Sequence, residues 1–419
     1  MFHRRSQKNS IIAGLDIGST AVRLAVGQLV PGTDNPKLHI IGAAEAPSEG
    51  VHKGVVTSIE ETVTSITTCL ERAERMIGQP VETAWVGISG SNIISETSKG
   101  VVAVSKSDGE ITVDDVERAI EAARTVATPL NYEILHVIPK SYTVDGQIGV
   151  SDPVGMTGVR LEVETQIIQT LSSQIKNLTK AVYRTSLDIN DLVLGILAAA
   201  EAVTTEKQKD LGVAVLNIGS SVSSLVAFQE GDILDIWSFL IGSQHITGDL
   251  AIGLRTSIEV AERVKIEYGT PLTKELNKND QIDLQDLGAA ETELIAKKYI
   301  AEIIEARVEE LLEQVERGLK RIGRGGLLPA GLILTGGGSK LNDLAEFTKQ
   351  KLKLPVALGY PLNITSVTDK VNDLSFATAI GLVKWGSLAL ETGANERSRG
   401  RSKNNILESV KKVLKMFVP

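Results

Sequence analysis

One six-residue phrase occurs twice in this chain. The first copy, LDIGST, begins at Leu15, and the second, LNIGSS, begins at Leu216, 201 residues later. Each copy follows an apolar stretch (IIAGLDI and GVAVLNI) and precedes another (AVRLAVGQL and SLVAFQEGDI). This pattern predicts a strand, a tight turn of small residues and a second strand in both places. We therefore expect two similar half-domains that face each other across a cleft.

The turns of both hairpins have the composition of an anion-binding loop. Gly18 and Gly219 allow the backbone to approach a ligand closely. The hydroxyl and backbone N–H groups of the next residues can face an anion. These residues are Ser19, Thr20, Ser220 and Ser221. A single turn of this kind is usually an ordinary hairpin turn that binds nothing, so it is the repetition that favours binding.

A third glycine-rich turn lies in the stretch LILTGGGSKLNDL. It predicts a buried strand, a turn formed by Gly336, Gly337 and Gly338, and then a helix. Such a turn admits a ligand, and the N-terminus of the following helix favours anions. The alternative is a tight strand-to-helix connection that binds nothing. The chain has no G-x-x-x-x-G-K-[ST] motif, which excludes a P-loop of that type.

The composition narrows the class of protein. The chain has 419 residues, 42% hydrophobic and 23% charged, which is ordinary for a soluble globular protein of about two to four domains. The net charge of −8 argues against nucleic acid as the main partner. The single cysteine, Cys69, excludes an internal disulfide and a cysteine-based zinc site. We find no signal peptide, and no run approaches the ~18 apolar residues of a membrane span.

Two long helices are predicted between the glycine turns. Thr57 and Glu60 have the spacing of a capping box, and apolar residues then recur at helical spacing as far as Ile77. The second helix covers residues 299–322, with an apolar stripe opposite charged side chains. Both stripes suit packing against a sheet. The five histidines form no metal-ligand motif, and metalloprotease and serine-hydrolase motifs are absent.

The C-terminal end differs in charge from the body of the protein. Residues 395–419 carry seven basic and two acidic side chains, a net charge of +5, which leaves −13 for the rest. Residues 387–403 have the polar, basic composition of a linker. An apolar face at helical spacing follows, with lysines beside it, and such a helix suits an anionic membrane surface. The alternative is a helix that docks on its own domain or on a partner. The predicted membrane-contacting residues are Ile406, Leu407, Val410, Lys411, Lys412, Val413, Leu414, Lys415 and Phe417.

The two hairpins and the glycine turn resemble the actin, Hsp70 and sugar-kinase superfamily, in which two α/β lobes hold a nucleotide between them. Within it, nearly the whole chain is similar to FtsA, a family of bacterial cell-division proteins. The most specific stretches are ILHVIPKSYTVDGQIGVSDPVGMTGVRLEVE at 134–164, HITGDLAIGLRTSIEVAERVKIEYG at 245–269 and EGVHKGVVTSIEETVTSI at 49–66.

The resemblance implies an α/β, actin-like two-lobed fold with an FtsA-type inserted small α/β subdomain and a C-terminal amphipathic helix. Strands TAWVGIS, GVVAVS, EILHVIP and VRLEVET, around a helix capped by Thr112, would form the insert. The implied divisions are subdomain 1A (1–85 and 166–210), insert 1C (86–165), subdomain 2A (211–248 and 326–386), subdomain 2B (249–325), a linker (387–403) and a membrane-targeting helix (404–419).

The resemblance also implies a site for ATP and Mg²⁺. The first phosphate loop would be Asp16, Gly18, Ser19 and Thr20, and the second Asn217, Gly219, Ser220 and Ser221. Asp16 would help to hold Mg²⁺ through water. The ribose and adenine would meet Glu262, Lys265, Gly336, Gly337, Gly338 and Ser339. For Glu262 and Lys265, the alternative is an ion pair on a helix surface.

Several positions depart from the family pattern. The second phosphate loop usually reads D-I-G-G-G-T-T-D, whereas residues 217–224 read NIGSSVSS. Ala21 replaces a lysine, Gly195-Ile196 replaces a Glu-Pro pair, and Asp343 replaces a glycine. Phosphoryl transfer depends on charge neutralisation by lysine and Mg²⁺, so these losses favour weak or absent hydrolysis. The alternative is that neighbouring residues compensate and slow hydrolysis persists.

We therefore expect a division scaffold on the cytoplasmic face of the cell membrane, at the division site, that binds ATP, polymerises and tethers the FtsZ ring. The resemblance implies FtsZ contact through 2B, contact with later division proteins through 1C, and an anionic membrane partner. Two other functions suit the fold: an active actin-like ATPase or small-molecule kinase, and a pilus-assembly actin homologue acting as a binding module at the inner membrane. The altered second loop argues against a kinase, and residues 134–164 favour FtsA over the pilus protein.

Overall fold

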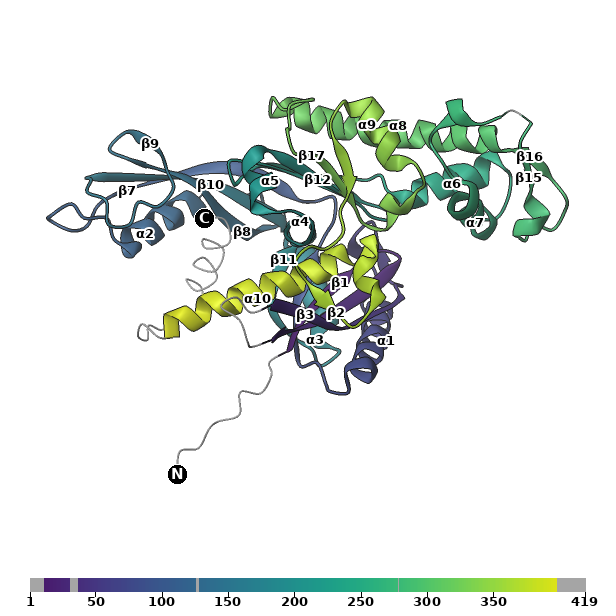
Figure 1. Cartoon of the computed structure of the whole chain (residues 1–419). Coiled ribbons are helices and arrows are strands. Elements are labelled where there is room, and N and C mark those ends of the chain that lie inside the picture. The colour runs from purple at the N-terminus through teal and green to yellow at the C-terminus, as the bar shows by residue number, and fades with distance from the viewer. Residues whose placement is uncertain (1–10, 31–36, 126–127, 278, 398–419) are drawn as a thin grey trace.

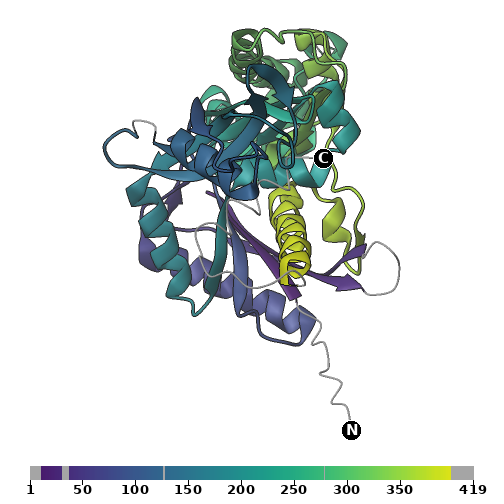
Figure 2. The same cartoon turned by 90° about the vertical axis from the view of Figure 1, so that its left-hand side faces the viewer.

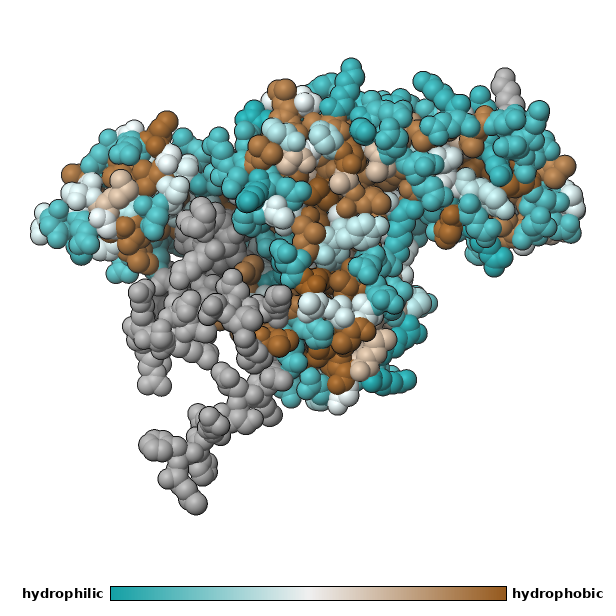
Figure 3. Space-filling model, viewed as in Figure 1, coloured by the Kyte–Doolittle hydropathy of each residue, from teal (hydrophilic) through white to brown (hydrophobic). Residues whose placement is uncertain are grey.

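The computed structural model describes residues 11–30, 37–125, 128–277 and 279–397. Figure 1 shows an N-terminal lobe below and a second lobe above it. A small α/β unit extends from one end of the pair and a mainly helical unit from the other. Hydrophilic residues cover most of the face in Figure 3, and hydrophobic residues gather toward its centre.

The first lobe contains a six-stranded sheet with the order β11-β6-β1-β2-β3-β19. Strands β1, β2 and β3 form an antiparallel meander, and β6 runs parallel to both β1 and β11. The first predicted hairpin, β1 and β2, is therefore the centre of this sheet. The strands are β1 (Ile11–Ile17), β2 (Ala21–Val30), β3 (Lys37–Pro47), β6 (Thr83–Ile88), β11 (Asp188–Leu194) and β19 (Thr365–Ser366), with a small separate hairpin, β4 (Val51–His52) and β5 (Val55–Val56).

The second lobe repeats this arrangement in a five-stranded sheet, β14-β13-β12-β17-β18. Here β12, β13 and β14 form the antiparallel meander and β17 runs parallel to β12. The single strand predicted at 224–233 is wrong, because Glu230 and Gly231 turn the chain with φ of 54° and 80°. The strands are β12 (Val213–Ile218), β13 (Ser223–Gln229), β14 (Asp232–Phe239), β17 (Gly331–Thr335) and β18 (Val356–Leu358).

Helices cover both faces of the first sheet. Helix α1 begins one residue later than predicted, since Ser58 rather than Thr57 accepts the capping hydrogen bond, from the Glu61 backbone N–H. The Thr57 hydroxyl instead donates to the Gly50 carbonyl oxygen at 3.1 Å. The helices of this part of the chain are α1 (Ile59–Ile77), α3 (Ser172–Tyr183), α4 (Gly195–Val203), α5 (Glu206–Leu211) and α10 (Ala377–Arg397).

Helix α10 returns the chain from the second lobe to the first. It packs against β1, β2, β6 and α4, and Figure 2 shows it beside the strands of the lower lobe with the upper lobe above. One continuous core joins α4, α10 and a face of each sheet. Small residues allow this contact, because a Cβ on Gly381 would lie 1.8 Å from the Ala198 carbonyl oxygen.

This return changes two expected boundaries. Residues 365–386, which the resemblance places in the second lobe, contribute strand β19 and helix α10 to the first lobe. Residues 387–397, expected as linker, continue α10. Residues 398–419, including the predicted membrane helix and all of its membrane-contacting residues, lie outside the described part of the chain.

The small α/β unit is a four-stranded antiparallel sheet, β7-β10-β8-β9, covered by α2. The predicted cap is confirmed: Thr112 and Asp115 form a capping box at the start of α2. The strand TAWVGIS is not part of this unit, because it forms β6 of the first sheet. The elements are β7 (Ile94–Ala103), α2 (Val113–Arg124), β8 (Tyr132–Val144), β9 (Gln147–Val150) and β10 (Arg160–Leu171).

The helical unit lies at the other end of the second lobe. Its long helix α8 agrees with the predicted 299–322 to within two residues. Its apolar stripe is buried mostly against helix α6 and only in small part against strand β14, whereas we expected it to pack against a sheet. None of the helices that the structure describes is long and apolar enough to cross a membrane. The elements are α6 (Ser243–Gly253), α7 (Ile258–Tyr268), β15 (Gln281–Asp283), β16 (Leu294–Ala296) and α8 (Lys297–Arg321), followed beyond β17 by α9 (Leu344–Leu352).

Candidate functional site

The two hairpins have the same geometry at their turns. In the first, the Gly18 backbone N–H donates to the Ala21 carbonyl oxygen at 3.1 Å, and in the second the Gly219 N–H donates to the Val222 carbonyl oxygen at 3.0 Å. The strand registers also correspond, residue for residue. The repeated phrase therefore builds the same turn twice, once in each lobe.

The side chains on the strands beside these turns do not correspond. Across the first sheet, Asp16, Arg23 and Glu45 face one another on β1, β2 and β3. Arg23 Nε lies 3.4 Å from Glu45 Oε2. A charged row therefore crosses the meander of the first lobe, beside its glycine turn.

The equivalent row of the second lobe is neutral. Asn217, Ser224 and Ser238 face one another on β12, β13 and β14. The two serine hydroxyl oxygens are 3.2 Å apart. Asn217 thus replaces the acid Asp16 in a row where serines also replace the cation Arg23 and the second acid, Glu45.

Asp16 is the titratable group of the first turn. Burial raises the pKa of its carboxyl to about 6, and the Arg23 cation opposes this with a smaller effect. The carboxylate is therefore ionised at neutral pH and gains a proton in mildly acidic solution. Arg23 is not among the predicted site residues. It could have been predicted, because it lies two residues after Ala21, where the turn ends, and this register places it opposite Asp16.

Backbone contacts hold the first turn in place. The Gly54 N–H donates to the Ser19 hydroxyl oxygen, and the Ser48 N–H donates to the Thr20 carbonyl oxygen, both at 3.0 Å. Ser19 accepts in this contact, so its own O–H remains a donor. Thr20 is exposed. The first turn therefore presents hydroxyl groups that can donate to an anion.

Helix α6 holds the second turn. The Ser243 and Gln244 N–H groups donate to the carbonyl oxygens of Gly219 and Ser220 at 2.9 and 2.8 Å. The Ser221 hydroxyl donates to Gln244 Oε1 at 3.0 Å. Unlike Ser19, Ser221 thus uses its proton within the protein.

Glu262 and Lys265 form an ion pair on α7, with Lys265 Nζ 2.6 Å from Glu262 Oε2. Both side chains also bond the Thr247 hydroxyl on α6, at 2.9 Å from Lys265 and 2.5 Å from Glu262. The Lys265 side chain is only 11% exposed. The ion pair is therefore half-buried and connects α7 to α6. It is not a simple ion pair on the exposed surface of one helix.

The third glycine turn lies against the second hairpin. Gly336 has φ of 86°, and a Cβ there would lie 2.2 Å from Asn217 Oδ1. A Cβ on Gly338 would lie 2.4 Å from Ile218 Cγ2. The structure thus places Gly336 against Asn217 and Gly338 against Ile218. Ser339 is buried, and its hydroxyl donates to the Thr335 carbonyl oxygen at 2.6 Å.

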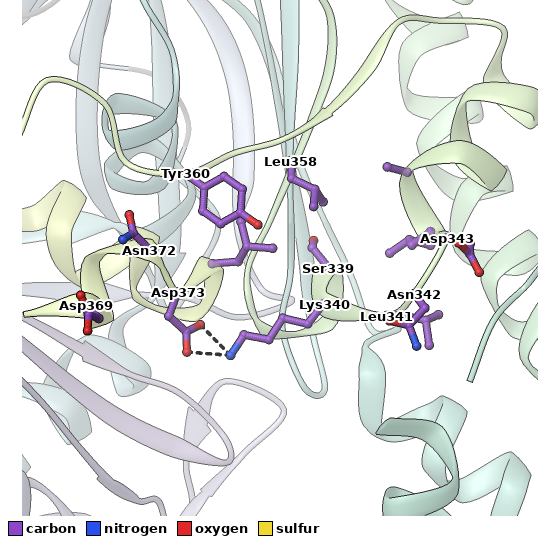
Figure 4. Close-up of a pocket in the computed structure, with 13 residues that line it drawn as sticks. Ser339, Lys340, Leu341, Asn342, Asp343, Leu358, Tyr360, Asp369, Asn372 and Asp373 are labelled. Carbon is purple, nitrogen blue, oxygen red and sulfur yellow. Dashed lines mark hydrogen bonds and ion pairs between the residues drawn. The ribbon is translucent and has the colours of Figure 1, made fainter. Parts of the chain in front are cut away.

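A pocket of about 540 Å³ opens beside this turn (Figure 4). Lys340 and Asp373 form an ion pair at 2.6 Å within it, and Leu358 and Tyr360 line another side. Ser339 is the only predicted nucleotide-binding residue in its lining. The pocket is therefore a neighbour of the predicted site rather than the site itself.

Two of the departures from the family pattern have local explanations. A side chain at position 195 would collide with Ser89, because a Cβ on Gly195 would lie 2.5 Å from the Ser89 hydroxyl oxygen. Asp343 adopts φ of 59°, and its carboxylate accepts a hydrogen bond from the Thr270 hydroxyl at 2.7 Å. Neither residue supplies a carboxylate or a lysine to the two hairpin turns.

The donor set limits the metal that could bind. Among the described residues, no cluster of three or more His, Cys, Asp or Glu side chains is placed to hold a metal ion. Asp16 is the one carboxylate among the predicted phosphate-loop residues. Magnesium at nucleotide sites commonly uses one or two carboxylates together with phosphates and waters. The residues therefore fit a magnesium ion held mainly by nucleotide and water.

Two family models match the chain. "SHS2 domain inserted in FTSA" matches residues 90–169, and "Cell division protein FtsA" matches residues 214–381. The chain is 34% identical to cell division protein FtsA of Pseudomonas aeruginosa, over 97% of this chain and 98% of that protein. It is 37% identical to the FtsA of Bacillus subtilis, over 94% of this chain and 86% of that protein.

Solved structures share the fold at low sequence identity. The PilM-PilN type IV pilus biogenesis complex aligns with a TM-score of 0.65 at 19% identity, over 90% of this chain and 99% of that one. MreB5 of Spiroplasma citri bound to AMPPNP aligns with a TM-score of 0.56 at 12% identity, over 93% and 99%. These two likenesses concern the fold alone, whereas the sequence matches extend along nearly the whole length. The chain belongs to the FtsA family of cell-division proteins and has an actin-like α/β fold with an inserted SHS2 domain.

Proposed function

We propose that this protein is a nucleotide-binding scaffold of cell division that binds ATP, polymerises on the cytoplasmic face of the membrane and tethers the FtsZ ring there. The observation that carries the nucleotide part is the pair of equivalent turns, one in each lobe, with the glycine turn beside the second. Backbone N–H groups and hydroxyls at such turns suit phosphate. Solved MreB5 structures of the same fold are described as bound to ADP and to AMPPNP.

The first lobe would supply the charged chemistry. Asp16 would help to hold Mg²⁺ through water, and Ser19 and Thr20 would donate to phosphate oxygens. When bound, Mg²⁺ would neutralise phosphate charge. Glu262 and Lys265 would lie beside the ribose, and the glycine turn from Gly336 beside the adenosine.

The second lobe would bind phosphate without supporting efficient hydrolysis. Its row Asn217, Ser224 and Ser238 holds no ionisable group. A carboxylate at position 217 would orient an attacking or metal-bound water, whereas the amide carries no charge and is not a base. We therefore propose that ATP acts as a bound structural ligand, and that any hydrolysis is slow.

The contacts with other molecules would follow the family arrangement. Subdomain 2B, residues 249–325, would bind FtsZ, and the insert 1C would bind later division proteins. Copies of the chain would associate into polymers. The C-terminal residues 404–419 would attach the protein to anionic lipid, consistent with their apolar face and with the basic charge of the chain end.

Co-sedimentation with anionic liposomes tests the tethering role. The full chain should pellet with liposomes and should carry FtsZ with it. Leu414→Glu places a charge on the apolar face and should abolish pelleting, whereas Asn405→Glu places the same charge on the opposite side and should retain it. Equal pelleting of the two variants would overturn the membrane role, and pelleting without FtsZ would overturn the tethering role.

A further inference from the structure

The amide nitrogen and the amide oxygen of Asn217 both contact other residues of the protein. Its Nδ2 donates to the Thr378 hydroxyl oxygen at 3.2 Å. Its Oδ1 lies against Gly336, so closely that a Cβ there would be 2.2 Å away. Asn217 therefore joins three segments that are far apart in the sequence: the end of β12, the glycine turn and the start of α10.

The hydrogen bond to Thr378 connects the two lobes. Asn217 belongs to the sheet of the second lobe. Thr378 is 4% exposed and lies on α10, which packs on β1, β2 and β6 of the first lobe. The next residue, Ala379, packs closely against β1, because a Cβ on Gly14 would lie 2.3 Å from the Ala379 carbonyl oxygen.

The amide suits this contact in a way that an acid does not. An amide donates to the threonine oxygen and brings no charge, whereas a carboxylate would have to accept from the threonine hydroxyl and would face the phosphates with a negative charge. Since the equivalent Asp16 in the first lobe has a cation opposite it and Asn217 has only Ser224, a neutral side chain matches its surroundings at this position.

We propose that Asn217 and Thr378 form an interlobe tie that couples the second hairpin turn to helix α10. Asn217 is then a positioning residue and not a catalytic one. The turn at Gly219 begins two residues after Asn217, and α10 runs from Ala377 to Arg397, where the C-terminal segment follows. At about 1.5 Å per residue this helix is roughly 30 Å long. A ligand that moves the end of β12 would therefore move α10 and, with it, residues 398–419, which follow α10 in the chain. This regulatory role rests on the proposed nucleotide binding, whereas the hydrogen bond between Asn217 and Thr378 does not.

Hydrogen exchange on the full chain tests the tie without any nucleotide. Thr378→Val keeps the shape of the side chain and removes the acceptor, and we expect exchange at the first turns of α10 to become about fivefold faster, as for the loss of one net hydrogen bond. Thr378→Ser retains the hydroxyl and should restore the wild-type rate. Ser387→Ala is the matched control, because the Ser387 hydroxyl bonds the Lys384 carbonyl oxygen within the same helix. Asn217→Ala combined with Thr378→Val should be no faster than either single variant.

Adding ATP tests the coupling separately. In the wild type, ATP should slow exchange in α10, and in Thr378→Val this response should be lost while the affinity for a fluorescent ATP analogue changes less than threefold. Wild-type exchange rates in Thr378→Val without nucleotide would overturn the tie. An unchanged ATP response in that variant would overturn the coupling. Failure of the wild type to bind the analogue would instead overturn the proposed nucleotide binding, and the exchange rates without nucleotide would still decide whether the tie exists.

Discussion

Asp16 lies directly opposite Arg23 on neighbouring strands, next to the first glycine turn. The equivalent places beside the second turn hold Asn217 and Ser224, with the same register and the same turn hydrogen bond. The backbone is repeated, but the charges are not. Because phosphate and Mg²⁺ respond to charge, the two lobes would handle a nucleotide differently, the first with an acid and a cation and the second with neutral donors only.

The half-buried Asp16 should make stability depend on pH. Its pKa is about 6 in the folded protein and near 4 in an unfolded chain. The folded state therefore binds the proton more tightly, so this group stabilises the fold below about pH 4 and loses that contribution as pH rises through 6. Asp16→Asn should raise the free energy of unfolding at pH 7 by up to ~3 kcal/mol and leave it unchanged at pH 4. Denaturant titrations at the two pH values measure this; an Asp16→Asn variant no more stable than wild type at pH 7 would contradict it.

His136 should act in the opposite direction. Burial lowers the pKa of its imidazole to about 4, and Nε2 accepts a hydrogen bond from the Leu194 N–H at 3.0 Å, which needs an unprotonated nitrogen. The unfolded chain, with a histidine pKa near 6.5, binds protons more readily between pH 6.5 and 4, so stability should fall by up to ~3 kcal/mol as pH falls through that range.

The two effects overlap in pH and partly cancel in the wild type. His136→Gln should therefore become more stable on acidification from pH 6.5 to 4, and Asp16→Asn should become less stable. Unfolding curves of both variants across this range give the comparison. Parallel profiles for the two variants would show that these groups do not set the pH dependence.

The crossing of α10 and α4 should not accept a side chain. A Cβ on Gly381 would lie 1.8 Å from the Ala198 carbonyl oxygen, and backbone cannot move aside as a flexible side chain can. Gly381→Ala should therefore lower the free energy of unfolding by about 2–3 kcal/mol. Gly248→Ala is the matched control within α6, where nothing lies within 4 Å, and it should raise stability by about 0.5–1 kcal/mol. Similar effects of the two substitutions would argue against tight packing at this crossing.

Ser19 of the first predicted phosphate loop and Ser221 of the second should differ in importance for ATP. The Ser19 hydroxyl accepts from Gly54 and keeps its proton, whereas the Ser221 hydroxyl donates its proton to Gln244. Ser19→Ala should therefore weaken ATP binding about tenfold, the size of a hydrogen bond to a charged group, and Ser221→Ala less than threefold. Titration with a fluorescent ATP analogue measures both, and a larger loss for Ser221→Ala would reverse our assignment.

The local patterns were sufficient for much of the fold. The repeated phrase predicted both central hairpins, and the Thr112 cap and the α8 stripe predicted helices that the structure contains. These features depend on neighbours in the sequence. The prediction of one strand at 224–233 failed because it ran through the polar segment QEGD, where Glu230 and Gly231 form a two-residue turn.

Long-range contacts were beyond the reach of the sequence. The β6 strand adjoins the insert in sequence but pairs with β1, and α10 follows the second sheet but packs on the first. Thr378 is 161 residues from Asn217, and no local pattern marks their contact. Arg23 is different, because counting outward from the turn places it opposite Asp16.

The fate of bound nucleotide tests the central claim most directly. The full chain is loaded with ATP and Mg²⁺ on anionic liposomes, and the nucleotide that remains bound is identified over time, with Asn217→Asp treated in parallel. A second lobe that binds phosphate without hydrolytic chemistry predicts that the wild type retains intact ATP. If the wild type instead holds ADP and releases phosphate, the neutral row at Asn217 supports hydrolysis after all, and the proposed role of ATP as a structural ligand is wrong.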